Sequence, residues 1–153
     1  MRAISEHKTL MPNTILIRNA DVVTLDEQGT ILRNANIAIE GKTIKAVGDA
    51  PSDFAKHADE VIDGYNHVAL PGFFNAHCHA PMTFERGWAE DLPFPRWLNE
   101  RIWVAESALT PDDVYWGASL AACEMIRTGC VAFNDHYFYM DRVAEVVEQS
   151  GMK

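Results

Sequence analysis

The chain has 153 residues, 48% of them hydrophobic, which is a usual size for one domain and enough to bury a core. Its formal net charge is -9 at pH 7, and its 13 Lys and Arg residues are scattered along the chain. A nucleic-acid polymer needs a basic patch on its partner, so this composition excludes that class of partner.

The first ten residues, MRAISEHKTL, contain no apolar core of signal-peptide length. No segment approaches the roughly 18 apolar residues of a membrane span, so we expect a cytoplasmic protein without a membrane partner. The cysteines Cys78, Cys123 and Cys130 are odd in number and have no CxxC spacing. They therefore predict reduced thiols, not a disulfide framework or a thiolate zinc motif.

Residues 14–48 consist of short β-type runs separated by breaks. TILIRNADVVTLD is the first run, and NIAIEGKTIKAVGD, in which Glu40 and Gly41 separate two apolar runs, predicts a hairpin. A polar, helix-tolerant segment and the short aliphatic runs VIDG and HVAL follow before Pro71. We predict a small β-domain over residues 1–65 and the start of a second domain over 66–153.

After Pro71 the pattern changes to strands that alternate with helices. GFFNAHCH predicts a strand, and FPRWLNERIWVAESA predicts an irregular helix because Trp97, Ile102 and Ala105 recur at spacings of three to five. Later, CVAFND predicts a second strand, and MDRVAEVVEQSG predicts a helix that stops at Gly151. The order β, α, β, α indicates a parallel α/β sheet or barrel.

The segment TPDDVYWGASLAACEMIRTG predicts the clearest helix. Thr110 can cap it, Pro111 suits its first turn, and Gly129 can close it. Apolar residues recur at i, i+4, i+7 and i+11, namely Val114, Ala118, Ala121 and Met125. One face of this helix is therefore expected to be buried.

His77 and His79 flank Cys78 at the end of the first predicted strand of the second domain. Side chains alternate along a strand, so the two histidines share a face and the cysteine points to the other. Two imidazoles supply half of a tetrahedral metal shell. A redox or zinc-knuckle cysteine cluster and a chance pair of hydrogen-bonding histidines remain alternatives. We interpret Cys78 as a small buried residue.

The segment LPGFFNAHCHAPM resembles the first-strand signature PGFxNxHxH of the amidohydrolase superfamily. The resemblance continues through residues 80–103 and 108–135, which look like the deaminase and chlorohydrolase branch, most closely its methylthioadenosine and S-adenosylhomocysteine deaminases. It implies an α/β fold: a (β/α)8 (TIM) barrel with an accessory N-terminal β-sandwich. This chain would cover the sandwich strands and the first two β/α units.

The resemblance also implies a cofactor and a substrate site. One divalent metal, zinc first and iron or manganese as alternatives, would be held by His77 and His79 together with a later histidine and aspartate. Its hydroxide would attack an amidine-type ring carbon and release ammonia. Glu106 aligns with an acid that holds ribose hydroxyls, and Trp97 with an aromatic residue that lines the substrate pocket. The plain alternatives are a solvated glutamate and a core tryptophan.

Two further groups of polar residues lie near the strand ends. Glu85 and Arg86 follow the histidines, where they could meet a substrate, and we favour a surface salt bridge as their interpretation. Asn134, Asp135 and His136 end the second strand, where barrel enzymes build their sites. Their identity does not decide between a site and an ordinary hydrogen-bonded strand end.

The expected function is hydrolytic deamination of an adenosine-type nucleoside, in the EC 3.5.4 class. The alternatives are a hydrolase of guanine, cytosine or triazine, a non-catalytic fragment, and an unrelated metal-binding protein. A barrel takes about 250 residues, and the later ligands and proton-transfer residues of the family are not in this segment. We therefore expect the N-terminal portion of a longer enzyme, inactive without its C-terminal part. A homo-oligomer is compatible with the sequence.

Overall fold

The computed structural model describes residues 13–51 and 53–153. The prediction that the first ten residues contain no signal-peptide core lies outside this described part. The chain divides into two compact units, Met1–Pro71 and Gly72–Lys153. The predicted domain limits, 1–65 and 66–153, stay a prediction. Across the described residues, no helix combines the length and the apolar character needed to cross a membrane.

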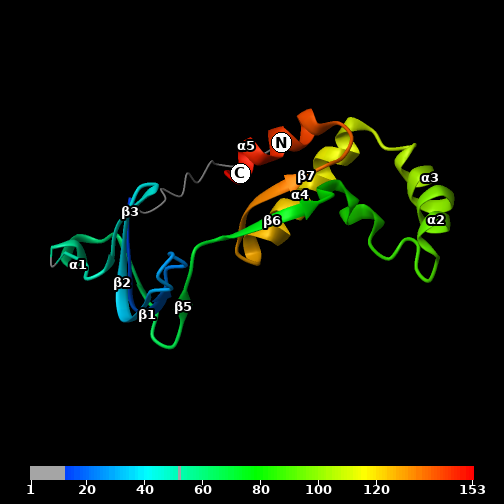
Figure 1. Ribbon diagram of the computed structural model, residues 1–153. Helices are drawn as coiled ribbons and strands as arrows, with labels where there is room; N and C mark the ends of the chain where they lie inside the picture. The colour runs from blue at the N-terminus through cyan, green and yellow to red at the C-terminus, as the bar shows by residue number, and fades with distance from the viewer. Residues whose placement is uncertain (1–12, 52) are drawn as a thin grey trace, which may run out of the picture. The chain divides into compact units, whose positions relative to one another are not determined.

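The first unit is built on a five-stranded sheet (Figure 1). Its strands are β1 (Thr14–Val23), β2 (Ile31–Glu40), β3 (Thr43–Gly48), β4 (Glu60–Asp63) and β5 (Val68–Ala69), and a short helix, α1 (Phe54–His57), precedes β4. The order is β3-β2-β1-β4, and β5 also pairs with β1. Strand β2 is antiparallel to β1 and β3, whereas β4 and β5 run parallel to β1.

The predicted hairpin is confirmed. Ile37 pairs with Val47 and Glu40 with Thr43 across β2 and β3. Gly41 makes the turn with φ +57°, a conformation that glycine adopts without a steric penalty. The small core of this sheet consists of Ala20, Val22 and Ala35, none more than 5% exposed. A β-sandwich around this sheet stays a prediction.

The second unit alternates strands and helices, which confirms the α/β class. Its elements are β6 (Phe73–Cys78), the 3-10 helix η1 (Ala80–Glu85), α2 (Phe94–Trp97), the π-helix η2 (Leu98–Ile102), α3 (Trp103–Glu106), α4 (Pro111–Arg127), β7 (Cys130–Asp135) and α5 (Met140–Ser150). Strands β6 and β7 are parallel, with Cys78 opposite Asp135. Their carboxyl ends therefore lie together, as in a β-α-β unit. The complete barrel stays a prediction.

Helix α4 begins and ends as the sequence predicts. Thr110 and Asp113 form a capping box at its start, and Gly129 follows its end with φ +83°. Its predicted inner face is confirmed, because Val114, Ala118 and Ala121 are buried and Met125 is half-buried. These side chains join a core contributed by η1, α5 and the chain end, namely Ala80, Val143, Val146 and Met152.

Gly117 allows η1 to lie directly on α4. A Cβ atom at this position would be 2.5 Å from the Pro81 carbonyl oxygen, which is far closer than such atoms approach. The Thr83 hydroxyl donates to the Gly117 carbonyl at 2.9 Å. This close contact holds the segment that follows His79 against the main helix of the unit.

The predicted irregular helix over FPRWLNERIWVAESA is confirmed as one helical run made of α2, η2 and α3. The π-helix η2 replaces α-helical geometry in the middle of the run. Its wider turn places residues five apart in related positions. This local irregularity allows Trp97 and Ile102 to line the same cavity.

Candidate functional site

His77 and His79 converge at the carboxyl end of β6. Their Nε2 atoms are 3.2 Å apart, and their ring centroids are 4.9 Å apart at an interplanar angle of 88°. His77 is exposed and His79 half-buried. The two imidazoles therefore lie on the same side of the strand, as the alternation of side chains predicts.

The geometry of this pair fits two ligands of one divalent metal. Two nitrogens bound tetrahedrally to zinc lie about 3.4 Å apart, close to the observed separation. His79 Nδ1 is 2.7 Å from the carbonyl oxygen of His136, which can only accept a hydrogen bond. Nδ1 therefore carries the proton, and Nε2 keeps a lone pair for a metal. No group of three or more His, Cys, Asp and Glu side chains within the described residues could complete a shell.

Cys78 lies on the opposite side from the histidines and packs against the core cluster that contains Val114. Burial raises the pKa of its thiol to about 11, with smaller contributions from Asp135 and Cys130. A thiol in this state is protonated at neutral pH, so it is a poor metal ligand and a poor nucleophile. Our interpretation of Cys78 as a packing residue agrees with this position.

A cavity of about 350 Å³ lies beside His79. It contains the other two predicted site residues, because Trp97 and Glu106 also line it. Aromatic and aliphatic side chains make up most of the remaining wall, namely Phe94, Leu98, Ile102, Trp103, Tyr137 and Phe138. An apolar cavity with a few polar groups and this volume is typical of a small-molecule site. The structure thus brings His79, Trp97 and Glu106 together.

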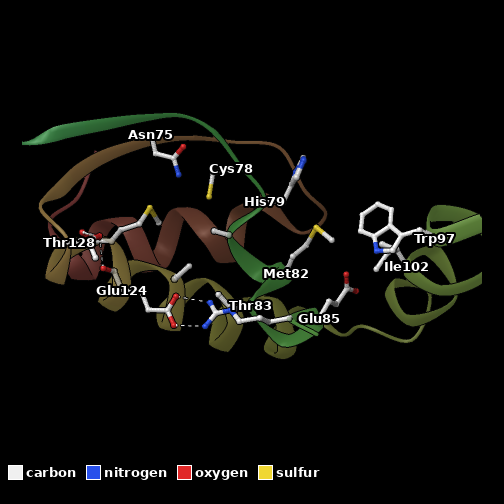
Figure 2. Close-up of a pocket in the computed structure, with 14 residues that line it drawn as sticks. Asn75, Cys78, His79, Met82, Thr83, Glu85, Trp97, Ile102, Glu124 and Thr128 are labelled. Atoms are coloured by element: carbon white, nitrogen blue, oxygen red, sulfur yellow. Dashed lines mark hydrogen bonds and ion pairs between the residues drawn. The ribbon is translucent and has the colours of Figure 1, made fainter. Parts of the chain in front are cut away.

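A second cavity of about 530 Å³ adjoins the first, and the two share His79, Met82, Trp97 and Ile102 (Figure 2). Figure 2 shows Met82 between His79 and Trp97, with Glu85 on the same side. Glu124 of α4 and Thr128, which follows α4, also line it, away from Trp97 (Figure 2). The shared residues make the region near His79 the junction of both cavities.

The prediction of a Glu85–Arg86 salt bridge is wrong. Arg86 instead donates two hydrogen bonds to Glu124, at 3.0 and 2.7 Å (Figure 2). Consecutive residues of a helical turn point in different directions, so the two side chains separate. Both carboxylate oxygens of Glu85 are inaccessible and have no hydrogen-bond partner among the described residues. Burial, followed by the charge of Glu106, raises the pKa of Glu85 to about 7.

Two residues at the end of β7 belong to the same region. Asp135 Oδ1 accepts hydrogen bonds from the amides of Ala80 at 3.2 Å and His136 at 2.8 Å, which ties the ends of β6 and β7 together. The Tyr137 hydroxyl is inaccessible and has no completed hydrogen bond among the described residues. Burial and then Glu106 raise its pKa. The strand end predicted the place of Asp135, but no sequence signal singled out Tyr137.

Comparisons with known proteins agree with the predicted resemblance. The model of the amidohydrolase family matches residues 68–153. A 5-methylthioadenosine/S-adenosylhomocysteine deaminase from Dictyoglomus turgidum is 50% identical over 139 residues, which cover 91% of this chain and 32% of that protein. The chain therefore spans about a third of the length of the curated relatives it matches.

Solved structures give the same result. An adenosine deaminase from Xanthomonas campestris with bound zinc matches with a TM-score of 0.81 and 34% identity, over 91% of this chain and 32% of that one. The atrazine chlorohydrolase of Arthrobacter aurescens TC1, complexed with zinc, matches with a TM-score of 0.73 and 28% identity, over 91% and 34%. The match of the family model over more than half of the sequence shows that the chain belongs to the amidohydrolase family.

Proposed function

We propose that this chain supplies part of the site of a metal-dependent enzyme that hydrolytically deaminates adenosine-type nucleosides, such as methylthioadenosine, S-adenosylhomocysteine or adenosine. The observation that carries the proposal is the convergence of His77 and His79 beside a cavity lined by Trp97 and Glu106. The deaminase names of the most similar relatives support the substrate class.

His77 and His79 would hold the metal, with zinc as the first candidate and iron or manganese as alternatives. A divalent ion at this position lowers the pKa of bound water, so that hydrolysis can proceed at neutral pH. The His136 carbonyl fixes the orientation of the His79 ring and leaves its Nε2 free to bind. The described part of the chain would thereby supply two imidazoles, of which that of His79 is held in orientation.

Trp97 and Glu106 would bind the nucleoside. The indole of Trp97 offers a large apolar surface for the purine or the sugar. The Glu106 carboxylate can accept one hydrogen bond from each hydroxyl of a vicinal diol, which suits the ribose. Both side chains are half-buried in the cavity wall, so they are partly desolvated before a ligand arrives.

Two imidazoles alone do not make a catalytic metal site, which needs three protein ligands and an open position. We infer that the reaction needs additional ligands and proton-transfer groups, supplied by a C-terminal part of the enzyme, and that residues 1–153 alone are inactive. A cytoplasmic location and a homo-oligomeric state also remain predictions.

Zinc affinity of the purified chain tests the metal site. We expect the unchanged chain to bind about one zinc ion per molecule, and His77→Ala or His79→Ala to weaken binding about 100-fold or more. His67→Ala is the matched control, because His67 lies in the first unit and contacts the Tyr65 carbonyl. Equal zinc affinity in all four proteins would refute the proposed ligands.

Substrate choice is tested on the native enzyme that contains this chain. Ammonia release from adenosine, methylthioadenosine and S-adenosylhomocysteine should exceed release from guanine, cytosine or an aminotriazine. The similarity to atrazine chlorohydrolase favours the triazine class as the second candidate. Preference for a triazine, which has no ribose, together with an unchanged rate in Glu106→Gln, would replace the nucleoside proposal with that alternative.

A further inference from the structure

Three polar side chains from separate elements meet at the wall of the cavity beside His79. Glu85 ends η1, Glu106 ends α3, and Tyr137 follows β7. Glu106 and Tyr137 line the smaller cavity, and Glu85 lines the adjoining one. We call Glu85, Glu106 and Tyr137 the carboxyl–tyrosine group. The proposed function uses only Glu106 from this group.

The polar atoms of Glu85 and Tyr137, the other two members, are buried and lack hydrogen-bond partners among the described residues. The Tyr137 hydroxyl and both Glu85 oxygens are inaccessible and lack a completed hydrogen bond among the described residues. A buried polar group without a partner destabilises the folded state. Such groups in a cavity wall are therefore expected to have a partner in the working site.

Glu106 is a candidate partner for Tyr137, because the two side chains line the same cavity. Its carboxylate interacts with the Tyr137 hydroxyl strongly enough to raise the pKa of the tyrosine, second only to burial. Glu85 raises it further through its charge. The hydroxyl is therefore protonated at neutral pH and can donate a hydrogen bond.

We propose that Tyr137 is a positioning residue, whose hydroxyl donates to Glu106 and aims its carboxylate into the cavity. The functional consequence rests on the proposed binding of the ribose diol by Glu106. A glutamate at the end of a helical run has several free torsions, and ordering them opposes ligand binding. A hydrogen bond that fixes the carboxylate in advance removes part of this entropic cost.

The orientation itself can be measured without ligand or activity. We would label the glutamate carboxyl carbons of the chain with ¹³C and follow the Glu106 resonance by NMR in Tyr137→Phe. We expect this resonance to shift, because the variant loses only the hydroxyl. Tyr115→Phe is the matched control, since the Tyr115 hydroxyl bonds Gln149 of α5 at 2.8 Å. An unmoved Glu106 resonance in Tyr137→Phe would overturn the inference.

The consequence for binding is measured with two probes, adenosine and 2′,3′-dideoxyadenosine, on the native enzyme after removal of its metal, so that neither probe is deaminated. The dissociation constant of the dideoxy probe divided by that of adenosine measures how much the diol contributes to binding. Tyr137→Phe should reduce this ratio about three- to tenfold. Glu106→Gln should reduce the ratio further.

The outcomes separate the two ideas. If Glu106→Gln lowers the ratio and Tyr137→Phe does not, the positioning inference is wrong and the proposed role of Glu106 stands. If Glu106→Gln leaves the ratio unchanged, or the enzyme binds neither probe, the proposed function fails, and the NMR measurement alone decides whether Tyr137 orients Glu106.

Discussion

The two sides of the second unit differ in the residues that they contain and in how these residues are packed. The packed side, where η1 and α5 contact α4, consists of small and aliphatic residues such as Val114, Ala118 and Val143, each at most 2% exposed. The open side, at the carboxyl ends of β6 and β7, holds His79, Glu85 and other polar groups, several of which have no hydrogen-bond partner within residues 13–51 and 53–153. The comparison indicates that apolar burial is concentrated on the packed side, whereas the unsatisfied polar groups gather on the open side.

The largest effect is expected from Gly117→Ala on the packed side. The new Cβ would meet the Pro81 carbonyl oxygen at 2.5 Å, so η1 must move away from α4. We expect a loss of about 1–3 kcal/mol in the free energy of unfolding. Urea unfolding followed by tryptophan fluorescence measures it, because Trp88, Trp97, Trp103 and Trp116 all lie in the second unit.

The neighbouring Ser119→Ala is the control for Gly117→Ala, because the Ser119 hydroxyl bonds only within α4, to the Tyr115 carbonyl. It should change the free energy of unfolding by less than about 0.5 kcal/mol. Both variants should bind zinc with unchanged affinity when folded. If Gly117→Ala weakened zinc binding without lowering stability, the separation between the two sides would be wrong.

A medium effect is expected from Thr110→Ala, which removes the cap of α4. The Thr110 hydroxyl accepts from the Asp113 amide at 3.3 Å. Its loss should lower the free energy of unfolding by about 1 kcal/mol. Ser107→Ala, at an exposed position just before the cap, should have a smaller effect in the same urea experiment. Equal effects of the two variants would show that the capping box does not stabilise the packed side.

On the open side, Glu85 should make stability depend on pH. Its pKa is raised from 4.5 to about 7, so folding favours the protonated acid. The unfolded chain ionises first, and stability should therefore fall between about pH 4.5 and 7 and level off above it. In Glu85→Gln, the decrease in stability that comes from ionisation of Glu85 should be absent. This variant should therefore be more stable than the unchanged chain at pH 8.

The groups that face Glu85 are Glu106 and Tyr137, so Tyr137→Phe serves as a control that retains the titrating acid. Urea midpoints at pH 4 to 8 provide the measurement. Identical profiles for Glu85→Gln and the unchanged chain would show that Glu85 ionises freely and is not held as a neutral acid.

The smallest effect is expected from Arg86→Ala, which breaks the exposed pair with Glu124 between η1 and α4. Exposed ion pairs contribute little, and salt screens them. The urea midpoint should shift only slightly at low salt and not at all in 1 M salt. A large, salt-independent loss would mean that this pair, and not the apolar core, joins η1 to α4.

Patterns within the sequence predicted most of the local structure. The hairpin at Gly41, the capped start of α4 at Thr110 and the shared face of His77 and His79 follow from residue types and their spacing. Each of these features depends on neighbours in the chain, so the period of the element determines it. The resemblance to the amidohydrolase family rests on the same local motifs, and the family match confirms it.

Only the tertiary structure decided which distant residues share a site. Glu85 was expected beside Arg86, but η1 turns its carboxylate inward while Arg86 reaches α4. Tyr137 carries no local signal, yet the end of β7 places it beside Glu106, about thirty residues earlier in the chain. Burial and the approach of a second charge are properties of packing, and they decide the pKa and the hydrogen-bond partners of such groups. Residue spacing alone contains no information about them.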